Sequence, residues 1–171
     1  MTIEIRPERD ADMDAIREVN RLAFGQNQEA ALVDALRSNG ASLLSLVATS
    51  NGGVVGHIMY SPALVQGRGG AALGPMAVRP DHQRRGIGTA LVDAGNRQLR
   101  AAGYPFIVVV GHPEFYPRFG FRPASGHGIA CEWDVPDEVF MVLVLDGPTM
   151  SGVSGLAKYR AEFALVADDA H

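Results

Sequence analysis

A glycine-spaced basic loop lies in the middle of the chain, between an apolar segment and a segment with helical spacing. It reads Gln83-Arg84-Arg85-Gly86-Ile87-Gly88-Thr89. A helix that begins near Gly86 leaves its first backbone N–H groups unpaired and carries partial positive charge at that end. A pyrophosphate placed there gains hydrogen bonds and dipole attraction, and Gly86 and Gly88 remove side chains that would block it. These residues predict an anion-binding loop.

Two familiar phosphate-binding motifs do not fit this loop. A nucleotide P-loop needs a lysine followed by serine or threonine after its second glycine, whereas Gly88 is followed by Thr89 and Ala90. The dinucleotide fingerprint needs a third glycine or alanine at position 91, which is Leu91, and an acidic residue that closes a following strand. The sequence offers neither.

The loop instead resembles the acetyl-CoA loop of the GNAT superfamily of N-acetyltransferases, which reads Gln or Arg, two residues, Gly, one residue, Gly or Ala. The strand before it ends in Pro75-Met76-Ala77-Val78, as in the family's central strand, and the helix after it closes with Gly103. Residues 115–121 resemble the family's downstream short helix and turn. The resemblance covers residues 1–146 and is strongest to a bacterial subgroup of predicted acetyltransferases, which also carries the Gly-Val-Ser-Gly segment at 152–155.

The resemblance implies that acetyl-CoA is the cosubstrate and that its pantetheine arm pairs with the free edge of the strand before the loop. Gly74 and Pro75 suggest a bulge there that opens room for the thioester, although a simple edge-strand irregularity would use the same residues. A strand N–H near Met76 or Ala77 is expected to hold the oxyanion. The expected acetyl-CoA-binding residues are Met76, Ala77, Val78, Arg84, Arg85, Gly86, Ile87, Gly88 and Thr89.

The family moves the acetyl group directly from CoA to a primary amine in a ternary complex, and we expect the same reaction here. Departure of the CoA thiolate benefits from a proton donor near the sulfur. Tyr116 resembles the family's tyrosine acid, and a tyrosine pKa of about 10 keeps the hydroxyl protonated at neutral pH. The alternative is that Tyr116 is a core aromatic residue, because Phe115, Phe119 and Phe121 surround it.

The general base is where this sequence departs from the better-known family members. Many of them carry a glutamate on the central strand, whereas residues 71–78 contain no acidic side chain. His112 is a candidate, since histidine titrates near neutrality and this one lies at the exit of the next strand. Weaker candidates are Glu29, Glu114, Glu132 and Asp134. A deprotonated amine or a water chain would need none of them.

The acceptor pocket of this fold is assembled from the first two helices and late loops, here roughly residues 24–36 and 124–138. Glu29 and His57 are the expected acceptor contacts, although a histidine on an apolar strand is more often a satisfied sheet residue. Protein N-termini, lysines, polyamines, antibiotics and amino acids all stay open as acceptors. Two alternative functions are a catalytically weak acyl-CoA sensor or interaction module, and an enzyme that transfers a longer acyl group.

Composition narrows the class of protein. The chain has 171 residues, of which 47% are hydrophobic, and this suits one globular domain. A formal charge of −4 argues against nucleic-acid binding. We expect a cytoplasmic protein without membrane contact, because no apolar run approaches a membrane span and the N-terminus is charged. Cys131 is interpreted as a small buried hydrophobic residue, and His82, His127 and His171 share no ligand spacing, so no metal is expected.

Hydrophobic periodicity predicts strands at 2–6, 43–48, 54–65, 71–78, 106–110 and 139–145, and helices through 13–23, 29–36 and 86–102. Asn51-Gly52 predicts a tight hairpin between the second and third strands. The predicted fold is a mixed α/β (α+β), GNAT-like sheet that is splayed at the acetyl-CoA strand and flanked by helices. Residues 1–146 form the GNAT domain, and 147–171 are a C-terminal extension on the same domain or on a dimer partner. A homodimer would use the apolar strand 139–145 and this extension.

Overall fold

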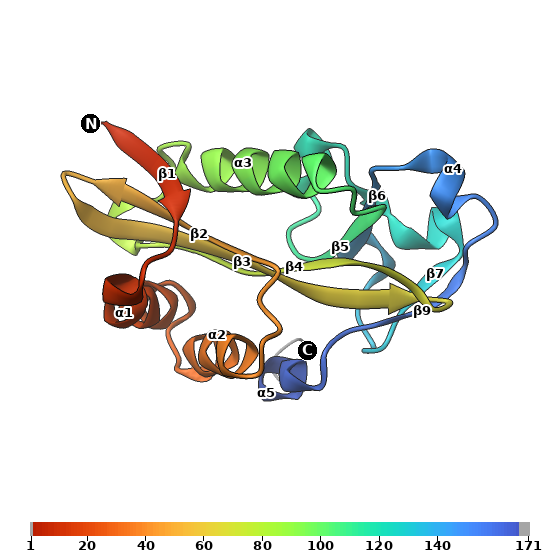
Figure 1. Cartoon of the computed structure of the whole chain (residues 1–171), viewed down its shortest axis with the longest axis horizontal. Coiled ribbons are helices and arrows are strands. Elements are labelled where there is room, and N and C mark those ends of the chain that lie inside the picture. The colour runs from red at the N-terminus through yellow and green to blue at the C-terminus, as the bar shows by residue number, and fades with distance from the viewer. Residues whose placement is uncertain (1, 168–171) are drawn as a thin grey trace.

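The computed structural model describes residues 2–167, which form one mixed sheet with helices on both faces (Figure 1). The strands are β1 Ile3–Pro7, β2 Leu44–Ser50, β3 Gly53–Val65, β4 Arg68–Val78, β5 Phe106–Val110, β6 Arg122–Pro123, β7 Ile129–Cys131, β8 Phe140–Val144 and β9 Gly155–Lys158. The helices are α1 Met13–Phe24, α2 Gln28–Ser38, α3 Ile87–Ala101, α4 Gly147–Met150 and α5 Ala164–Ala167. Short 3-10 turns connect them, among which Tyr116–Phe119 and Ala161–Phe163 bear on the site.

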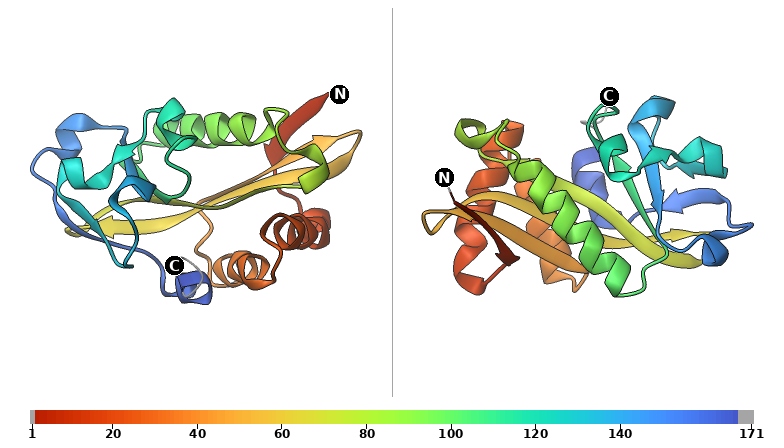
Figure 2. Two further views of the ribbon diagram at one scale, coloured as in Figure 1. Left: turned by 180° about the vertical axis from the view of Figure 1, so that it is seen from behind. Right: turned by 90° about the horizontal axis from the view of Figure 1, so that it is seen from above.

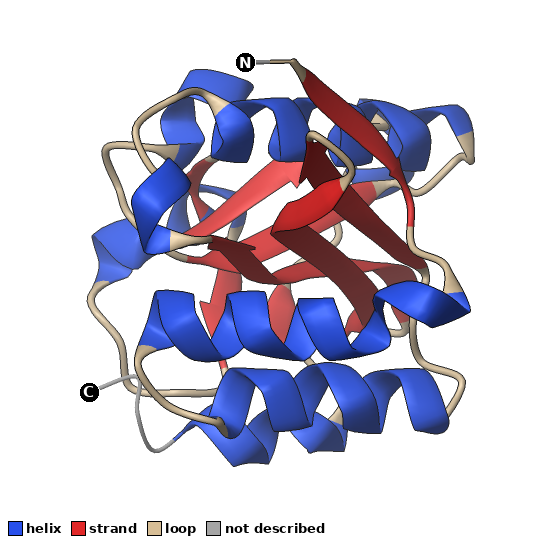
Figure 3. Ribbon diagram, turned by 90° about the vertical axis from the view of Figure 1, so that its left-hand side faces the viewer, coloured by secondary structure: helices blue, strands red, loops and turns tan. Residues whose placement is uncertain are grey.

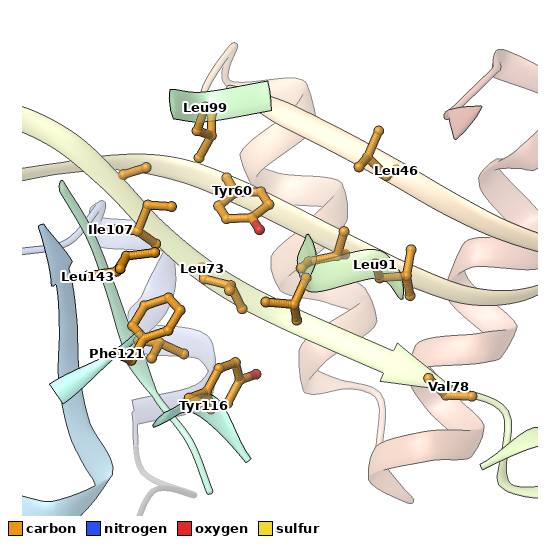
Figure 4. Close-up of a cluster of buried hydrophobic side chains, with 14 of the residues drawn as sticks. Leu46, Tyr60, Leu73, Val78, Leu91, Leu99, Ile107, Tyr116, Phe121 and Leu143 are labelled. Atoms are coloured by element: carbon orange, nitrogen blue, oxygen red, sulfur yellow. The ribbon is translucent and has the colours of Figure 1, made fainter. Parts of the chain in front are cut away.

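Buried apolar side chains of the described residues form three clusters on the faces of the sheet, of which two are described here as the first and second core. The main path of the sheet runs β1-β2-β3-β4-β5-β8-β6, with β7 and β9 attached beyond it. Helix α3 crosses one face, while α1, α2 and α5 cover the other (Figures 1, 2 and 3). Leu91 and Leu99 of α3 pack on Tyr60 and Ile107 in the first core (Figure 4), and Ile16, Leu32 and Leu36 pack on Met59 in the second. The predicted fold class is confirmed.

The predicted hairpin between β2 and β3 is present. Asn51 and Gly52 both have positive φ, 52° and 82°, as the tight turn requires. Strand β3 is longer than β2, and beyond Tyr60 its outer edge pairs instead with β9, where Leu64 lies opposite Lys158. Residues from the C-terminal extension thereby become part of the sheet.

Strand β4 leaves its parallel neighbour β5 part-way along. Pairing with β5 runs from Ala71 to Leu73 and then stops. On the other edge, Tyr60 lies opposite Leu73 and Ile58 opposite Met76, so Gly74 and Pro75 form a bulge against β3; the peptide between them is cis. The predicted splay is therefore confirmed, because residues 74–78 of β4 have a free edge on the β5 side.

The C-terminal extension, as far as residue 167, packs on the same domain. Strand β9 joins β3 and β7, and Phe163 is buried against α2 residues of the second core. Residues 168–171 of the predicted extension, His171 among them, lie outside the described residues. Strand β8 lies between β5 and β6, and its side chains 140–143 are buried in the domain's own core. They are not available to a partner copy, which corrects the expectation of a dimer contact through this strand.

Candidate active site

A cleft of about 1560 Å³ opens where β4 and β5 diverge. One end is lined by the loop 82–89 and by residues 111–118, which pack on the α3 side of the sheet. The other end is lined by residues of α1, α2, α5 and the C-terminal extension. Residues 74–78 of β4 line the passage between the two ends. The splay therefore gives two ligands access to one point from opposite faces.

The N-terminus of α3 forms the anion end of this cleft. Gly86 is the N-cap residue, with φ of 81°, and the Ala90 N–H donates to its carbonyl at 3.0 Å. The N–H groups of Ile87, Gly88 and Thr89 therefore precede the first intrahelical bond and are free to bind an anion. The Gln83 side-chain amide donates to the Val78 carbonyl at 2.9 Å and ties the loop to the end of β4.

Most of the predicted loop residues line the cleft, with two qualifications. Arg85, expected among the acetyl-CoA-binding residues chiefly through its backbone, is exposed and does not line the cleft. The Ile87 side chain is 2% exposed and packs in the first core, so only its backbone can serve the site. At Gly88 a Cβ would lie 3.3 Å from Cε of Met76 and 3.6 Å from Cζ of Phe115, so any larger side chain there enters the cleft.

The predicted strand edge is also in place. Met76, Ala77 and Val78 line the cleft and are paired on their other side with Ile58, His57 and Gly56. Among the described residues no strand covers their β5-facing edge. Their backbone N–H and C=O groups on that side can bind an extended, amide-containing ligand as a further strand would.

Tyr116 lines the same cleft from the start of a 3-10 helix and is 6% exposed. Its ring packs edge to face on Phe115 at 5.0 Å and on Phe121 at 5.6 Å between centroids. Figure 4 shows the hydroxyl pointing away from Phe121. Burial raises the pKa of Tyr116 above its usual value, so the hydroxyl stays protonated across the neutral range. Tyr116 is therefore a core aromatic residue that also lines the cleft, and its role as a proton donor stays a prediction.

Gly111 makes room for the Tyr116 ring. A Cβ at position 111 would lie 2.3 Å from Cε2 and 2.8 Å from Cδ2 of Tyr116, well inside van der Waals contact. The Gly111 N–H donates to the Val139 carbonyl at 2.9 Å, so this backbone is held by the sheet. No sequence pattern indicated this role of Gly111, because its contact with Tyr116 depends on how the loop after β5 folds back.

The candidate general bases fall into two groups, those that line the cleft and those that do not. His112 and Glu114 line it beside Tyr116, and both are exposed. Glu29 lines it from the first turn of α2, is 9% exposed, and accepts hydrogen bonds from the Gln26 amide at 3.0 and 3.2 Å. Glu132 and Asp134 do not line the cleft, so the structure places these two base candidates away from the site.

His57 is not an acceptor contact, which corrects the expectation. Its side chain is 0% exposed and does not line the cleft. The ring lies between Nδ2 of Asn20 at 3.2 Å and Oγ of Ser45 at 2.9 Å, and the Ser45 hydroxyl donates to Glu8. The Asn20 amide donates to Nδ1, so Nε2 carries the proton toward Ser45. Burial lowers the pKa of His57 to about 4, and the ring is a neutral part of a structural network.

Three cleft-lining aromatic residues were missed or left unspecified by the sequence interpretation. Trp133 falls within the expected segment 124–138, but Tyr159 and Phe163 come from the C-terminal extension, for which no role was predicted. The three rings contact one another, and the Tyr159 hydroxyl is buried without a hydrogen-bond partner among the described residues. Aromatic residues near a chain end carry no positional signal in a single sequence.

No group of three or more histidine, cysteine, aspartate or glutamate side chains in residues 2–167 is arranged to hold a metal ion. No helix in the same part of the chain is both long and apolar enough to cross a bilayer.

Comparisons with known proteins agree with this geometry. Residues 41–123 match the model of the acetyltransferase (GNAT) domain. The uncharacterized N-acetyltransferase YhbS of Escherichia coli K12 is 36% identical over 162 residues, which cover 93% of this chain and 97% of the relative. The chain belongs to the GNAT family. The resemblance stated from the loop and the strand before it is thereby confirmed.

Solved GNAT structures have the same fold. The structure of Escherichia coli YhbS in complex with CoA has a TM-score of 0.91 at 35% identity and covers 95% of this chain and 92% of its own. A GNAT acetyltransferase from Brucella melitensis in complex with acetyl-CoA has a TM-score of 0.79 at 37% identity. The match covers 95% of this chain and 98% of the Brucella chain. The C-terminal extension is therefore within the span shared with these GNAT proteins.

The missing strand glutamate is a real feature of this GNAT site. β4 from Arg68 to Val78 has no acidic residue, so no carboxylate enters the cleft from the central strand. The carboxylates that do line it, Glu29 and Glu114, come from α2 and from the turn after β5. With His112, these are the candidate general bases from the sequence that line the cleft.

Proposed function

We propose that this protein is an acetyl-CoA-dependent N-acetyltransferase that acts on a primary amine. The observation that carries the proposal is the single cleft that joins the free N–H groups of Ile87, Gly88 and Thr89 to the free edge of β4 and to Tyr116. The pyrophosphate of acetyl-CoA binds at the start of α3, and its pantetheine arm runs along Met76–Val78 toward the splay. The CoA and acetyl-CoA complexes of the GNAT relatives support this cosubstrate.

The reaction is a direct transfer within a ternary complex. The amine nitrogen attacks the thioester carbonyl carbon, a C–N bond forms, and the C–S bond breaks as the CoA thiolate departs. A β4 N–H near Met76 or Ala77 stabilises the oxyanion of the tetrahedral intermediate. The proton lost by the amine passes to solvent or to His112, which is the candidate base beside Tyr116. Acetyl-CoA and the amine can be bound at the same time, because the cleft opens on both faces of the sheet.

Tyr116, predicted as the general acid, stabilises the departing thiolate in this proposal. Its raised pKa keeps the hydroxyl protonated, and it also makes complete transfer to a thiolate unfavourable, since a thiol pKa is about 8.5. The hydroxyl therefore acts by donating a hydrogen bond to sulfur as the negative charge develops. Water or solvent acid then protonates the released thiolate.

The test is thiol release from acetyl-CoA over a broad panel of amines, with initial rates measured while both substrates are varied. A ternary complex gives intersecting double-reciprocal lines. Tyr116→Phe should lower kcat by roughly 10²-fold or more with unchanged CoA affinity, whereas Tyr104→Phe, at a half-buried tyrosine outside the cleft, serves as the matched control. Wild-type turnover in Tyr116→Phe would remove this residue from the mechanism.

A second candidate function is favoured by the acid-free β4 strand. A protein with the same cleft and no base could act as an acyl-CoA sensor. In that case acetyl-CoA binds with ordinary affinity, and no amine in the panel accelerates thiol release above the rate of hydrolysis.

A further inference from the structure

Three aromatic side chains form a continuous wall on the acceptor side of the cleft. We use the name aromatic wall for Trp133, Tyr159 and Phe163. Tyr159 packs edge to face on Trp133 at 4.7 Å and on Phe163 at 4.9 Å between ring centroids, and Trp133 lies 6.2 Å from Phe163. All three line the cleft. They present ring surface to whatever occupies this end of the site.

The wall begins where β4 leaves β5. A Cβ built on Gly74 would lie 3.8 Å from Cε1 of Phe163, so that ring stands beside the bulge where the thioester is placed. Phe163 is buried with Ile16, Leu32 and Met59 in the core under α1 and α2, and Trp133 and Tyr159 pack against the same core. The wall is therefore on the opposite face of the sheet from α3 and its anion-binding end.

The C-terminal extension holds the wall in a fixed position. The Tyr159 backbone N–H donates to the Glu132 carboxylate at 2.6 Å, next to Trp133. The Asn39 amide at the end of α2 donates to Glu162 at 3.0 Å, adjacent to Phe163. Hydrogen bonds from Arg160 and then from Asn39 hold the pKa of Glu162 at about 2, so the carboxylate is charged at every ordinary pH. The rings are preorganised.

Glu29 supplies the charge on this side. The other acidic and basic residues that line the cleft, His82, Arg84, His112, Glu114 and Arg118, belong to the loop and turn that pack on the α3 side. Glu29 is 9% exposed, and no ion pair reaches it within residues 2–167; its hydrogen bonds come from the neutral Gln26 amide. A nearly buried carboxylate in apolar surroundings favours one neighbouring cation.

We propose that the acceptor is a monoamine whose nitrogen is carried on an apolar aromatic or aliphatic body. This rests on the proposed function and names its substrate class. The body packs on the aromatic wall, and the ammonium is attracted by Glu29 and by the ring faces before it loses a proton and attacks. A polyamine would leave its second charge desolvated against Phe163, and an amino acid would bring a carboxylate toward Glu29. Both classes are disfavoured.

Trp133 of the aromatic wall is the sole tryptophan of the chain, so tryptophan fluorescence reports on this wall alone. Its fluorescence is measured while phenethylamine or hexylamine is titrated into the protein saturated with CoA. A saturable change is expected with these amines, and spermidine and glycine should bind at least tenfold more weakly. Phe163→Ala should weaken phenethylamine binding about tenfold, equivalent to about 1.4 kcal/mol. Leu165→Ala, at an exposed α5 residue outside the cleft, should leave it unchanged.

Charge recognition is tested separately. Glu29→Gln should weaken phenethylamine binding about tenfold and leave the isosteric alcohol, 2-phenylethanol, within twofold of wild type. If Phe163→Ala does not fold, Phe163→Leu gives the same comparison with less loss of volume. Tighter binding of spermidine, equal effects of the Phe163 and Leu165 variants, or the absence of any fluorescence response to either amine overturns the inference.

These outcomes are distinct from failure of the proposed function. Saturable binding of phenethylamine without thiol release would support the wall as an amine site and refute the acetyltransferase assignment. Thiol release that is fastest with spermidine would support the acetyltransferase assignment and refute the acceptor class.

Discussion

Gly111→Ala is the substitution whose effect follows most directly from the structure. The added Cβ would lie 2.3 Å from Cε2, 2.8 Å from Cδ2 and 3.3 Å from Cζ of Tyr116. Ordinary carbon contacts are about 3.5–4.0 Å, so the ring must move by roughly 1 Å. Phe115 and Phe121 pack on that ring at 5.0 and 5.6 Å, and the Gly111 backbone is bonded to Val139, so neither side yields freely.

Gly111→Ala should have two measurable effects, a loss of stability and a loss of kcat. Overpacking of this kind costs roughly 1–3 kcal/mol, which lowers Tm by about 2–4 °C per kcal/mol in a domain of this size. Misplacement of a reacting group by about 1 Å costs on the order of 10²-fold in kcat. CoA affinity should change little, because the N–H groups of Ile87, Gly88 and Thr89 belong to α3 and not to the turn after β5.

The assay combines thermal unfolding with steady-state thiol release, using the best amine acceptor of the panel. The matched control is Gly126→Ala, since a Cβ there meets no atom within 4 Å and its φ is not positive. Because Gly111→Ala acts through the Tyr116 hydroxyl, it should lower kcat little further in a Tyr116→Phe background, while the loss of stability persists. Wild-type Tm and kcat in Gly111→Ala would refute the argument that Gly111 positions Tyr116.

Two other expectations can be checked directly. Gly88→Trp should abolish CoA binding by filling the cleft beside Met76. Arg84→Ala should only weaken CoA binding, because backbone N–H groups hold the phosphate. If calorimetric titration finds the two variants indistinguishable, the pyrophosphate does not bind at the start of α3 as proposed. The free energy of unfolding should fall as the pH drops from 6.5 toward about 4, by up to about 1.4 kcal/mol per unit, because the unfolded chain binds the proton that buried His57 excludes. Glu8, whose pKa is lowered from 4.5, begins to add its own loss at the acidic end of this range, as the pH falls below that value. Chemical denaturation measures the free energy of unfolding across this range. In His57→Gln this free energy should depend less steeply on pH, and a dependence equal to wild type would exclude His57 as the cause of the loss.

The sequence was informative wherever function depends on backbone conformation within one segment. The loop 83–89 and the strand before it needed only their own residues to predict an anion site, a bulge and a free edge, because glycine and proline act locally. Asn51-Gly52 fixed its hairpin for the same reason. Alternating and helical spacing likewise predicted the buried faces of β5 and α3.

The roles of single side chains were harder to predict. His57 looked like an acceptor contact, yet its ring points toward Asn20 and Ser45 instead of the cleft. The direction in which a strand residue points depends on which neighbours cover each face of the sheet. Arg85 was likewise expected among the acetyl-CoA-binding residues, yet it precedes the N-cap of α3, is exposed and does not line the cleft.

By itself, the sequence determined the family, the cosubstrate loop and the splayed strand, since these follow from short motifs with strong local preferences. Only the tertiary structure decided which side chains line the end of the cleft away from α3. Glu29, Trp133 and Phe163 are separated by long stretches of chain and share no motif, and they meet because β9 pairs with β3 and carries the end of the chain back under α2. Contacts of this kind arise from the packing of distant elements, which no local spacing encodes.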